Sequence, residues 1–333
     1  MNRNRRHFNL QAFTGGTGIA RTDAEALIPV QESHEIIQGV VEQSAVLQRG
    51  KRLANMTSAQ SSMPVLDMLP LAYFVNGEGG SARKRITEMA WGKKKIYAEE
   101  IAVIVPVPEA VVDDADYDIW GEVRPRLMEA FGQKIDGAIL FGEDKPEKWR
   151  EDVVATATKA GASVTLGADL YKSILGEDGV IAKVEESGYF VNGHMADITM
   201  RAKLRGLQDA TGQPVFKSDM QGGTVYTLDG SPMSFPRNGA FDRGRALMIS
   251  GDFSQLVYSI RQDITFKLFD QGIIQNPDTG EIMYNLMQND MVALRAVMRL
   301  GWEIPNPINA MVKDKVKRCP FAVLTAAKTN AGA

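Results

Sequence analysis

A long run of apolar residues spaced four apart constrains the fold of this chain more than any other feature. The positions of this run are Ile119, Val123, Leu127, Phe131, Ile135 and Ile139, and Gly142 ends it. Such spacing places apolar side chains along one face of an α-helix. About 25 residues at 1.5 Å per residue give a rod of roughly 38 Å, which is long for a globular domain. The sequence therefore predicts a long spine helix.

Acidic residues and one proline lie near the expected start of this helix. The acidic residues are Asp113, Asp114, Asp116 and Asp118, and we expect them in its first turn, where the helix dipole favours negative charge. Pro125 predicts either a kink or the start of the helix. An EF-hand calcium loop needs glycine at its sixth position and glutamate at its twelfth. Counted from Asp114, these positions are Ile119 and Pro125, so no metal site is predicted.

Two apolar, β-branched runs interrupted by prolines, residues 64–75 and 96–107, predict strands. Between them, a glycine-rich stretch at residues 77–80 predicts a turn. Six cations and one large aromatic residue follow this turn: Arg83, Lys84, Arg85, Trp91, Lys93, Lys94 and Lys95. We expect a long two-stranded ribbon that projects from the body. Because an isolated hairpin is marginally stable in water, the ribbon is expected to lie on a neighbour.

The other segments mix helices and strands irregularly, which predicts the α+β class. Residues 1–31 indicate an extended arm, and Ser33 is the expected N-cap of a short amphipathic helix that reaches Leu47. Residues 169–186 predict helix interrupted at 176–179, and a second amphipathic segment covers 193–207. Strands are expected at 246–268 and 291–304, on either side of a loop.

Charge and cysteine content narrow the class of protein. The chain has 38 Lys and Arg against 41 Asp and Glu, a net charge of −3, whereas a dedicated DNA-binding protein has a basic excess. The single cysteine, Cys319, cannot form an internal disulfide, which suits synthesis in the cytosol. No stretch approaches the ~20 apolar residues that span a bilayer, and the N-terminus lacks the apolar run of a signal peptide.

Motifs of known catalytic chemistry are missing from the sequence. The three histidines, His7, His34 and His194, have no HExxH spacing, and there is no GxSxG elbow. The glycines at 77–80 do not fit a phosphate-binding loop. We therefore predict that the protein is not an enzyme and binds no cofactor. The basic residues of the ribbon and the N-terminal arginines could contact nucleic acid or acidic surfaces of another copy, and the near-neutral charge favours the second.

An arm, a projecting ribbon and a long spine helix all bury their own surface poorly, so neighbouring copies must complete the fold. In order and spacing, these elements resemble the HK97-like family of major capsid proteins of tailed bacteriophages. The resemblance rests on IPVQESHEIIQGVVEQSAVLQ for the arm and helix, PVLDMLPLAYFV to IAVIVPVP for the ribbon, called the E-loop, and DDADYDIWGEVRPRLMEAFGQKIDGAILFG for the spine helix. It continues through FVNGHMADITMRAKLRGLQDATGQPVF, GDFSQLVYSIRQDITFKLF and NDMVALRAVMRLGWEIPNPINAMV, and so covers nearly the whole chain.

The resemblance implies a division of the chain. It assigns 1–50 to the N-terminal arm and short helix and 51–106 to the E-loop ribbon. Residues 107–142 and 258–297 would form the peripheral domain with the spine helix, and 143–257 and 298–333 the axial domain. The loop at 269–290 would meet symmetry-related copies. The candidate inter-subunit contacts are Arg83, Lys84, Arg85, Trp91, Lys93, Lys94, Lys95, Asn276 and Asp278.

The resemblance also implies a function. The chain would self-assemble into hexamers and pentamers of an icosahedral phage head around double-stranded DNA, which it would contact non-specifically. It would be assembled in the host bacterial cytoplasm and become part of the virion. A portal and a separate scaffolding protein are expected partners, the latter because the arm starts almost at Met1, and a decoration protein is a further candidate.

One branch of the family joins its subunits by an isopeptide bond between an E-loop lysine and an asparagine, assisted by a glutamate on the following strand. Lys93 to Lys95 and the asparagines Asn276 and Asn289 are available here, but residues 291–300 contain no acid. We therefore predict no autocatalytic cross-linking. Two alternatives remain: an encapsulin-type compartment that encloses a cargo enzyme, and a soluble enzyme with an unrecognised site. The glycine-rich arm and the long ribbon favour the phage shell.

Overall fold

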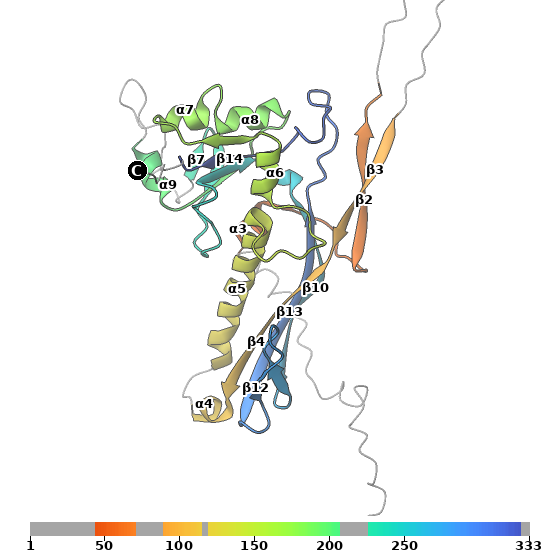
Figure 1. The fold of residues 1–333 in the computed structure, drawn as a ribbon, viewed down its shortest axis with the longest axis vertical. Helices are drawn as coiled ribbons and strands as arrows, with labels where there is room; N and C mark the ends of the chain where they lie inside the picture. The colour runs from red at the N-terminus through yellow and green to blue at the C-terminus, as the bar shows by residue number, and fades with distance from the viewer. Residues whose placement is uncertain (1–43, 71–88, 115–118, 207–225, 328–333) are drawn as a thin grey trace, which may run out of the picture.

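The computed structural model describes residues 44–70, 89–114, 119–206 and 226–327. Within these ranges the strands form a four-stranded sheet, a six-stranded sheet and two separate two-stranded ribbons. The larger sheet and most of the short helices lie at one end of the long helix, and the four-stranded sheet runs alongside that helix (Figure 1). This mixture of helices and strands confirms the predicted α+β class.

The four-stranded sheet has the order β1-β10-β13-β4. These strands are β1 (Lys51–Arg52), β4 (Glu99–Pro108), β10 (Val257–Phe269) and β13 (Met291–Glu303). The central strand β13 is antiparallel to both of its neighbours, β10 and β4. Its apolar side chains share a buried cluster with those of the long helix, so helix and sheet stabilise one another.

The predicted spine helix is confirmed as α5 (Ile119–Phe141). Pro125 lies inside α5, so the helix does not begin there. The expected acidic first turn is wrong for Asp113 and Asp114, because both belong to the separate short helix α4 (Glu109–Asp114), and residues 115–118 lie outside the described ranges. After α5, Gly142 has a φ of +71°, a left-handed conformation that favours glycine and turns the chain away from the helix.

The six-stranded sheet has the order β5-β14-β9-β6-β8-β7. Its strands are β5 (Ser163–Thr165), β6 (Gly193–Ala196), β7 (Tyr226–Leu228), β8 (Ser231–Ser234), β9 (Met248–Gly251) and β14 (Phe321–Thr325). The accompanying helices are α6 (Val153–Lys159), α7 (Leu170–Leu175), α8 (Val180–Glu186) and α9 (Met200–Arg205). The break between α7 and α8 confirms the predicted interruption at residues 176–179.

Three predicted segments differ from the structure in detail. The amphipathic segment 193–207 begins with the fully buried strand β6, and only α9 is helical, because strands on both sides bury β6. The single strand expected at 246–268 is two strands, β9 and β10, which lie in different sheets and are separated by a 3₁₀ turn, η2 (Phe253–Gln255). The loop after β10 contains a hairpin of β11 (Ile273–Gln275) and β12 (Ile282–Asn285).

The predicted ribbon exists, but with different strands. It consists of β2 (Gln60–Met68) and β3 (Ala90–Tyr97), which pair antiparallel and project beside the body in Figure 1. The expected strand 96–107 is divided, since β3 ends at Tyr97 and the chain enters the body sheet as β4. The lysine-rich stretch before it is therefore part of the ribbon's second strand rather than of its tip. Of the strands within 51–106, β1 and β4 pair with the body sheet.

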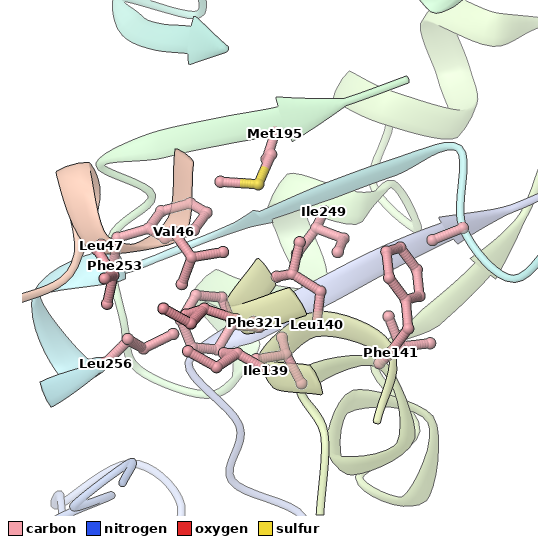
Figure 2. Packing of buried hydrophobic residues seen from close by; sticks show 14 of the residues in the cluster. Val46, Leu47, Ile139, Leu140, Phe141, Met195, Ile249, Phe253, Leu256 and Phe321 are labelled. Atoms are coloured by element: carbon pink, nitrogen blue, oxygen red, sulfur yellow. The ribbon is translucent and has the colours of Figure 1, made fainter. Parts of the chain in front are cut away.

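A single buried cluster connects the two sheets through the end of α5. Short helix α3 (Ala45–Arg49) contributes Val46 and Leu47 to this cluster, and Figure 2 shows them among Phe253, Leu256 and Phe321. Burial of such side chains stabilises the fold by about 25 cal/mol per Å². The arm expected at 1–31 and the residues from Ser33 to position 43 lie outside the described part of the chain.

Candidate assembly surfaces

The structure places the described candidate contact residues at two separate locations. Trp91 and the three lysines Lys93, Lys94 and Lys95 belong to β3 of the ribbon. Asn276 and Asp278 lie in the turn between β11 and β12, at the other end of the body sheet in Figure 1. The remaining candidates, Arg83, Lys84 and Arg85, lie outside the described residues.

One face of the ribbon combines an aromatic ring with positive charge. Successive side chains of a strand point to opposite faces, so Trp91, Lys93 and Lys95 share one face of β3. Leu66 and Pro64 of β2 lie opposite Trp91 and Lys93, respectively. Trp91 is 62% exposed in the single chain. Exposed tryptophans are enriched at the centres of protein interfaces, whereas lysines more often lie at the polar rim.

The other face of the ribbon is tied to the body by polar contacts. Lys94 Nζ lies 3.7 Å from Glu303 Oε1, and the same oxygen accepts a 2.8 Å hydrogen bond from Arg150 Nη1. Farther along β2, the amide of Ile308 donates to the carbonyl of Leu66 at 3.0 Å. Lys315 also forms an ion pair with Asp67. These contacts hold both strands of the described ribbon against the end of β13 and the segment that follows it.

Close packing also holds the point where β3 passes into β4. Ile96 is buried in a small cluster with Met56 and Val257. The carbonyl of Tyr97 accepts a 3.1 Å hydrogen bond from Trp149 Nε1. A Cβ atom on Gly301 would lie 2.3 Å from that carbonyl oxygen, so only glycine allows β13 to approach this closely. The direction in which the ribbon leaves the body is therefore set by the body itself.

The β11–β12 hairpin has a polar turn and apolar strands. The Oδ1 atom of Asn276 accepts hydrogen bonds from the amides of Asp278 at 2.9 Å and Thr279 at 3.4 Å, which closes the turn. Exposed apolar side chains lie on the two strands and directly after β12: Ile273, Ile282, Met283 and Met287. Met287 is 72% exposed. Exposed apolar residues gathered on one short hairpin indicate a surface that another protein covers.

Among the described residues of one chain, the ribbon lysines lie far from Asn276. Lys94 lies at the base of the ribbon, while Asn276 lies at the far end of the body sheet in Figure 1, and its Oδ1 atom closes the turn. The acid of β13, Glu303, lies at the end of the strand beside the ribbon and pairs with Arg150. The absence of autocatalytic cross-linking stays a prediction.

A polar junction holds the first described residues against the spine helix. The carboxylate of Asp136 in α5 accepts hydrogen bonds from Ser44 Oγ at 2.5 Å, from the amides of Ala45 at 3.0 Å and Val46 at 3.2 Å, and from Asn238 Nδ2 at 2.7 Å. Asp136 is almost fully buried, and burial raises the pKa of its carboxyl group to about 6 despite these hydrogen bonds. The junction fixes the position of Ser44 and the start of α3 on the body.

Sequence reasoning missed this junction. Periodicity predicts which helical positions are apolar, but it does not predict a polar partner for a buried acid. The one signal was Asp136 itself, a carboxylate directly after the predicted core residue Ile135. An acid beside a core position needs hydrogen-bond partners, yet nothing in the sequence identifies Ser44 or Asn238 as those partners.

The described histidine and the cysteine are buried. His194 is fully buried, and its Nε2 atom lies 3.1 Å from the carbonyl of Leu228. Because a carbonyl only accepts, Nε2 carries the proton, and Nδ1 accepts from Ser250 Oγ at 2.8 Å. Burial lowers the pKa of His194 to about 4 and raises the pKa of the Cys319 thiol to about 11. Both side chains belong to the core, and His7 and His34 lie outside the described ranges.

No group of three or more His, Cys, Asp or Glu side chains within the described ranges is placed to hold a metal ion. No helix in the same part of the chain is both long and apolar enough to cross a membrane.

A spine helix along one sheet, a second sheet at its end and a projecting ribbon define the HK97-like fold of shell-forming proteins. The chain belongs to the phage capsid family, which matches residues 24–315. It is 26% identical over 275 residues to the major capsid protein of Staphylococcus phage 80alpha, covering 81% of this chain and 79% of that protein.

Solved structures of phage proteins support the assignment of the chain to this family. A chain from Microbacterium phage Oxtober96 has 33% sequence identity and a TM-score of 0.73, covering 93% of this chain and all of that chain (100%). A chain from Mycobacterium phage Bobi has 29% identity and a TM-score of 0.74, covering 94% of this chain and 100% of that one. The protein is therefore a phage major capsid protein, a structural component of the virion that assembles with copies of itself.

Proposed function

We propose that the chain forms the hexamers and pentamers of an icosahedral phage head that encloses double-stranded DNA. The observation that carries this proposal is the ribbon face with Trp91, Lys93 and Lys95, which the chain's own described residues leave exposed. In the shell this face lies over the adjacent subunit. Burial of Trp91 there removes apolar surface from water and stabilises the contact by about 25 cal/mol per Å².

The exposed apolar hairpin supports a second contact between copies. Its side chains, Ile273, Ile282, Met283 and Met287, meet symmetry-related hairpins. In this assignment the four-stranded sheet and α5 form the peripheral domain, and the six-stranded sheet and its helices form the axial domain. Closed symmetry then repeats each modest contact around the shell, so that many weak interfaces form a stable particle.

Other components complete the particle in this proposal. The chain assembles in the host bacterial cytoplasm with a separate scaffolding protein and a portal, and a decoration protein is a candidate for the outer surface. It contacts the packaged DNA without sequence preference. The net charge of −3 supports this arrangement, because a strongly basic lining would hold the genome and oppose its release. The role is structural, without catalysis, cofactor or covalent cross-link between subunits.

Expression of the full chain, alone and together with its scaffolding protein, tests this proposal. Electron microscopy of the purified products is expected to reveal uniform closed shells with fivefold and sixfold capsomers. Denaturing electrophoresis of the same shells is expected to give a single band at the monomer mass. A chain that stays monomeric under both conditions would contradict the proposal, and so would shells filled with one co-purifying enzyme.

A further inference from the structure

Five cationic side chains surround one pocket of about 230 Å³ at the base of the ribbon. They come from four parts of the chain: β3, the α5–α6 connection, α6 and the 304–318 segment that follows β13. In chain order they are Lys94, Arg150, Lys159, Lys315 and Arg318. In Figure 1 the base of the ribbon, α6 and the 304–318 segment come together beside the six-stranded sheet. None of the assembly contacts proposed above uses this pocket.

Arg318 is the least solvated of these cations. The residue is only 1% exposed. Its guanidinium group donates to Asn306 Oδ1 at 2.9 Å, to the Asn306 carbonyl at 3.0 Å and to the Val312 carbonyl at 2.7 Å. All three acceptors are neutral, and no ion pair joins Arg318 to an acid of the described residues. A buried guanidinium ordinarily needs a negative partner, because burial of an unpaired charge is costly.

The other four cations share too few carboxylates to supply that partner. Arg150 and Lys94 both face Glu303. Lys159 pairs with Glu151, and Lys315 pairs with Asp67. The cluster therefore holds five cations against three carboxylates, an excess of positive charge around a partly enclosed space. Such charges repel one another more strongly than they would in bulk water, and a bound anion relieves that repulsion.

We propose that this pocket binds a small, multiply charged oxyanion of the phosphate class. Lysine and arginine donors that converge on one site are the usual ligands of such ions. A volume of about 230 Å³ accommodates a phosphate ion with a few water molecules. The ion connects Lys94 of the ribbon with Lys159 of α6 and Lys315 of the 304–318 segment, and so stabilises the direction of the ribbon.

Titration of the full-length, unassembled chain with sodium phosphate tests this site. Ionic strength is held constant with sodium chloride, and binding is measured by calorimetry and by the shift in Tm. We expect saturable binding and a saturable rise in Tm. Lys94→Gln and Lys159→Gln should each weaken the affinity at least fivefold, because each removes one ligand and leaves Arg318 in place. Arg318 itself is not replaced, since its loss could unfold the chain.

Lys134→Gln is the matched control. Lys134 also forms an ion pair with an exposed acid, Asp144, but it lies outside this pocket. Its replacement should leave phosphate binding unchanged. A linear, non-saturable response to phosphate would overturn the proposal, and so would equal affinity in Lys94→Gln, Lys159→Gln and the unmodified chain.

Discussion

The hydroxyl group of Ser44 donates a 2.5 Å hydrogen bond to the carboxylate of Asp136, although 92 positions separate the two residues in the chain. This bond and the two amide bonds beside it attach α3 to the C-terminal part of the spine helix. Because the carboxylate is buried, water cannot replace a lost partner. The position of α3 on the body is therefore fixed by these bonds.

Replacement of Ser44 by Ala should lower the stability of the folded chain. Alanine removes the hydroxyl group that donates to the buried carboxylate of Asp136, and water cannot replace this donor. We expect the free energy of unfolding at pH 7 to fall by about 1–3 kcal/mol, measured by urea denaturation. The control is Ser58→Ala at an exposed serine, where the change should stay within about 0.5 kcal/mol. Equal stability of the two variants would contradict this account.

His194 and Asp136 should give opposite pH dependences of stability. The folded pKa of His194 is lowered from 6.5 to about 4, so its contribution is present above pH 6.5 and is lost as the pH falls towards 4. The folded pKa of Asp136 is raised from 3.8 to about 6, so its contribution is present below pH 3.8 and is lost as the pH rises through 6. Each shift corresponds to about 3 kcal/mol.

The two single variants separate these contributions. Between pH 6 and pH 4 the opposing effects largely cancel in the unmodified chain. In His194→Gln the remaining Asp136 should make the chain more stable as the pH falls, and in Asp136→Asn the remaining His194 should make it less stable. Urea denaturation at intervals of half a pH unit measures both trends. Parallel profiles for the two variants would rule out this assignment.

Replacement of Gly301 by Ala should disturb the base of the ribbon. The new Cβ atom would lie 2.3 Å from the carbonyl oxygen of Tyr97, so β13 and β3 must move apart. We expect a loss of more than about 2 kcal/mol in the free energy of unfolding, typical of overpacking in a core. Gly206→Ala is the matched control, because its nearest neighbour would lie at 3.5 Å. If both variants unfold at the same denaturant concentration, the close approach has no energetic consequence.

Replacement of Trp91 by Ala should impair assembly without affecting the fold. The side chain is mostly exposed in the single chain, so the Tm of unassembled subunits should change by less than one or two degrees. An interface tryptophan typically contributes about 2 kcal/mol or more, which predicts a critical concentration for assembly at least tenfold higher. Light scattering during assembly measures this concentration. Normal assembly of Trp91→Ala would mean that the ribbon face is not an interface.

The pattern of apolar residues predicted those elements whose structure depends on their own local sequence. The long helix was recognisable because six apolar residues at steps of four leave few other structures for residues 119–141. The strand 291–304 was recognisable because most positions of β13 are apolar, although Arg295 and Arg299 interrupt the run. In both cases the local pattern and the tertiary structure require the same side chains to be buried.

The remaining features depend on partners distant in sequence. The ribbon's second strand contains Lys93, Lys94 and Lys95, which look like a solvated turn, and their strand conformation follows only from pairing with β2. Strand β6 was assigned to the start of a helix because the four residues from Gly193 to Ala196 are too few to establish a strand pattern of alternating apolar and polar residues. The cationic pocket joins residues from position 94 to position 318, so no local pattern could indicate it.

The most direct measurement is a cryo-EM reconstruction of purified particles at a resolution that defines side chains. The account predicts a closed icosahedral shell in which the ribbon of each subunit lies on the adjacent copy and Trp91 is buried between them. A shell in which Trp91 remains exposed to solvent, or an open assembly without hexamers and pentamers, would contradict the central claim.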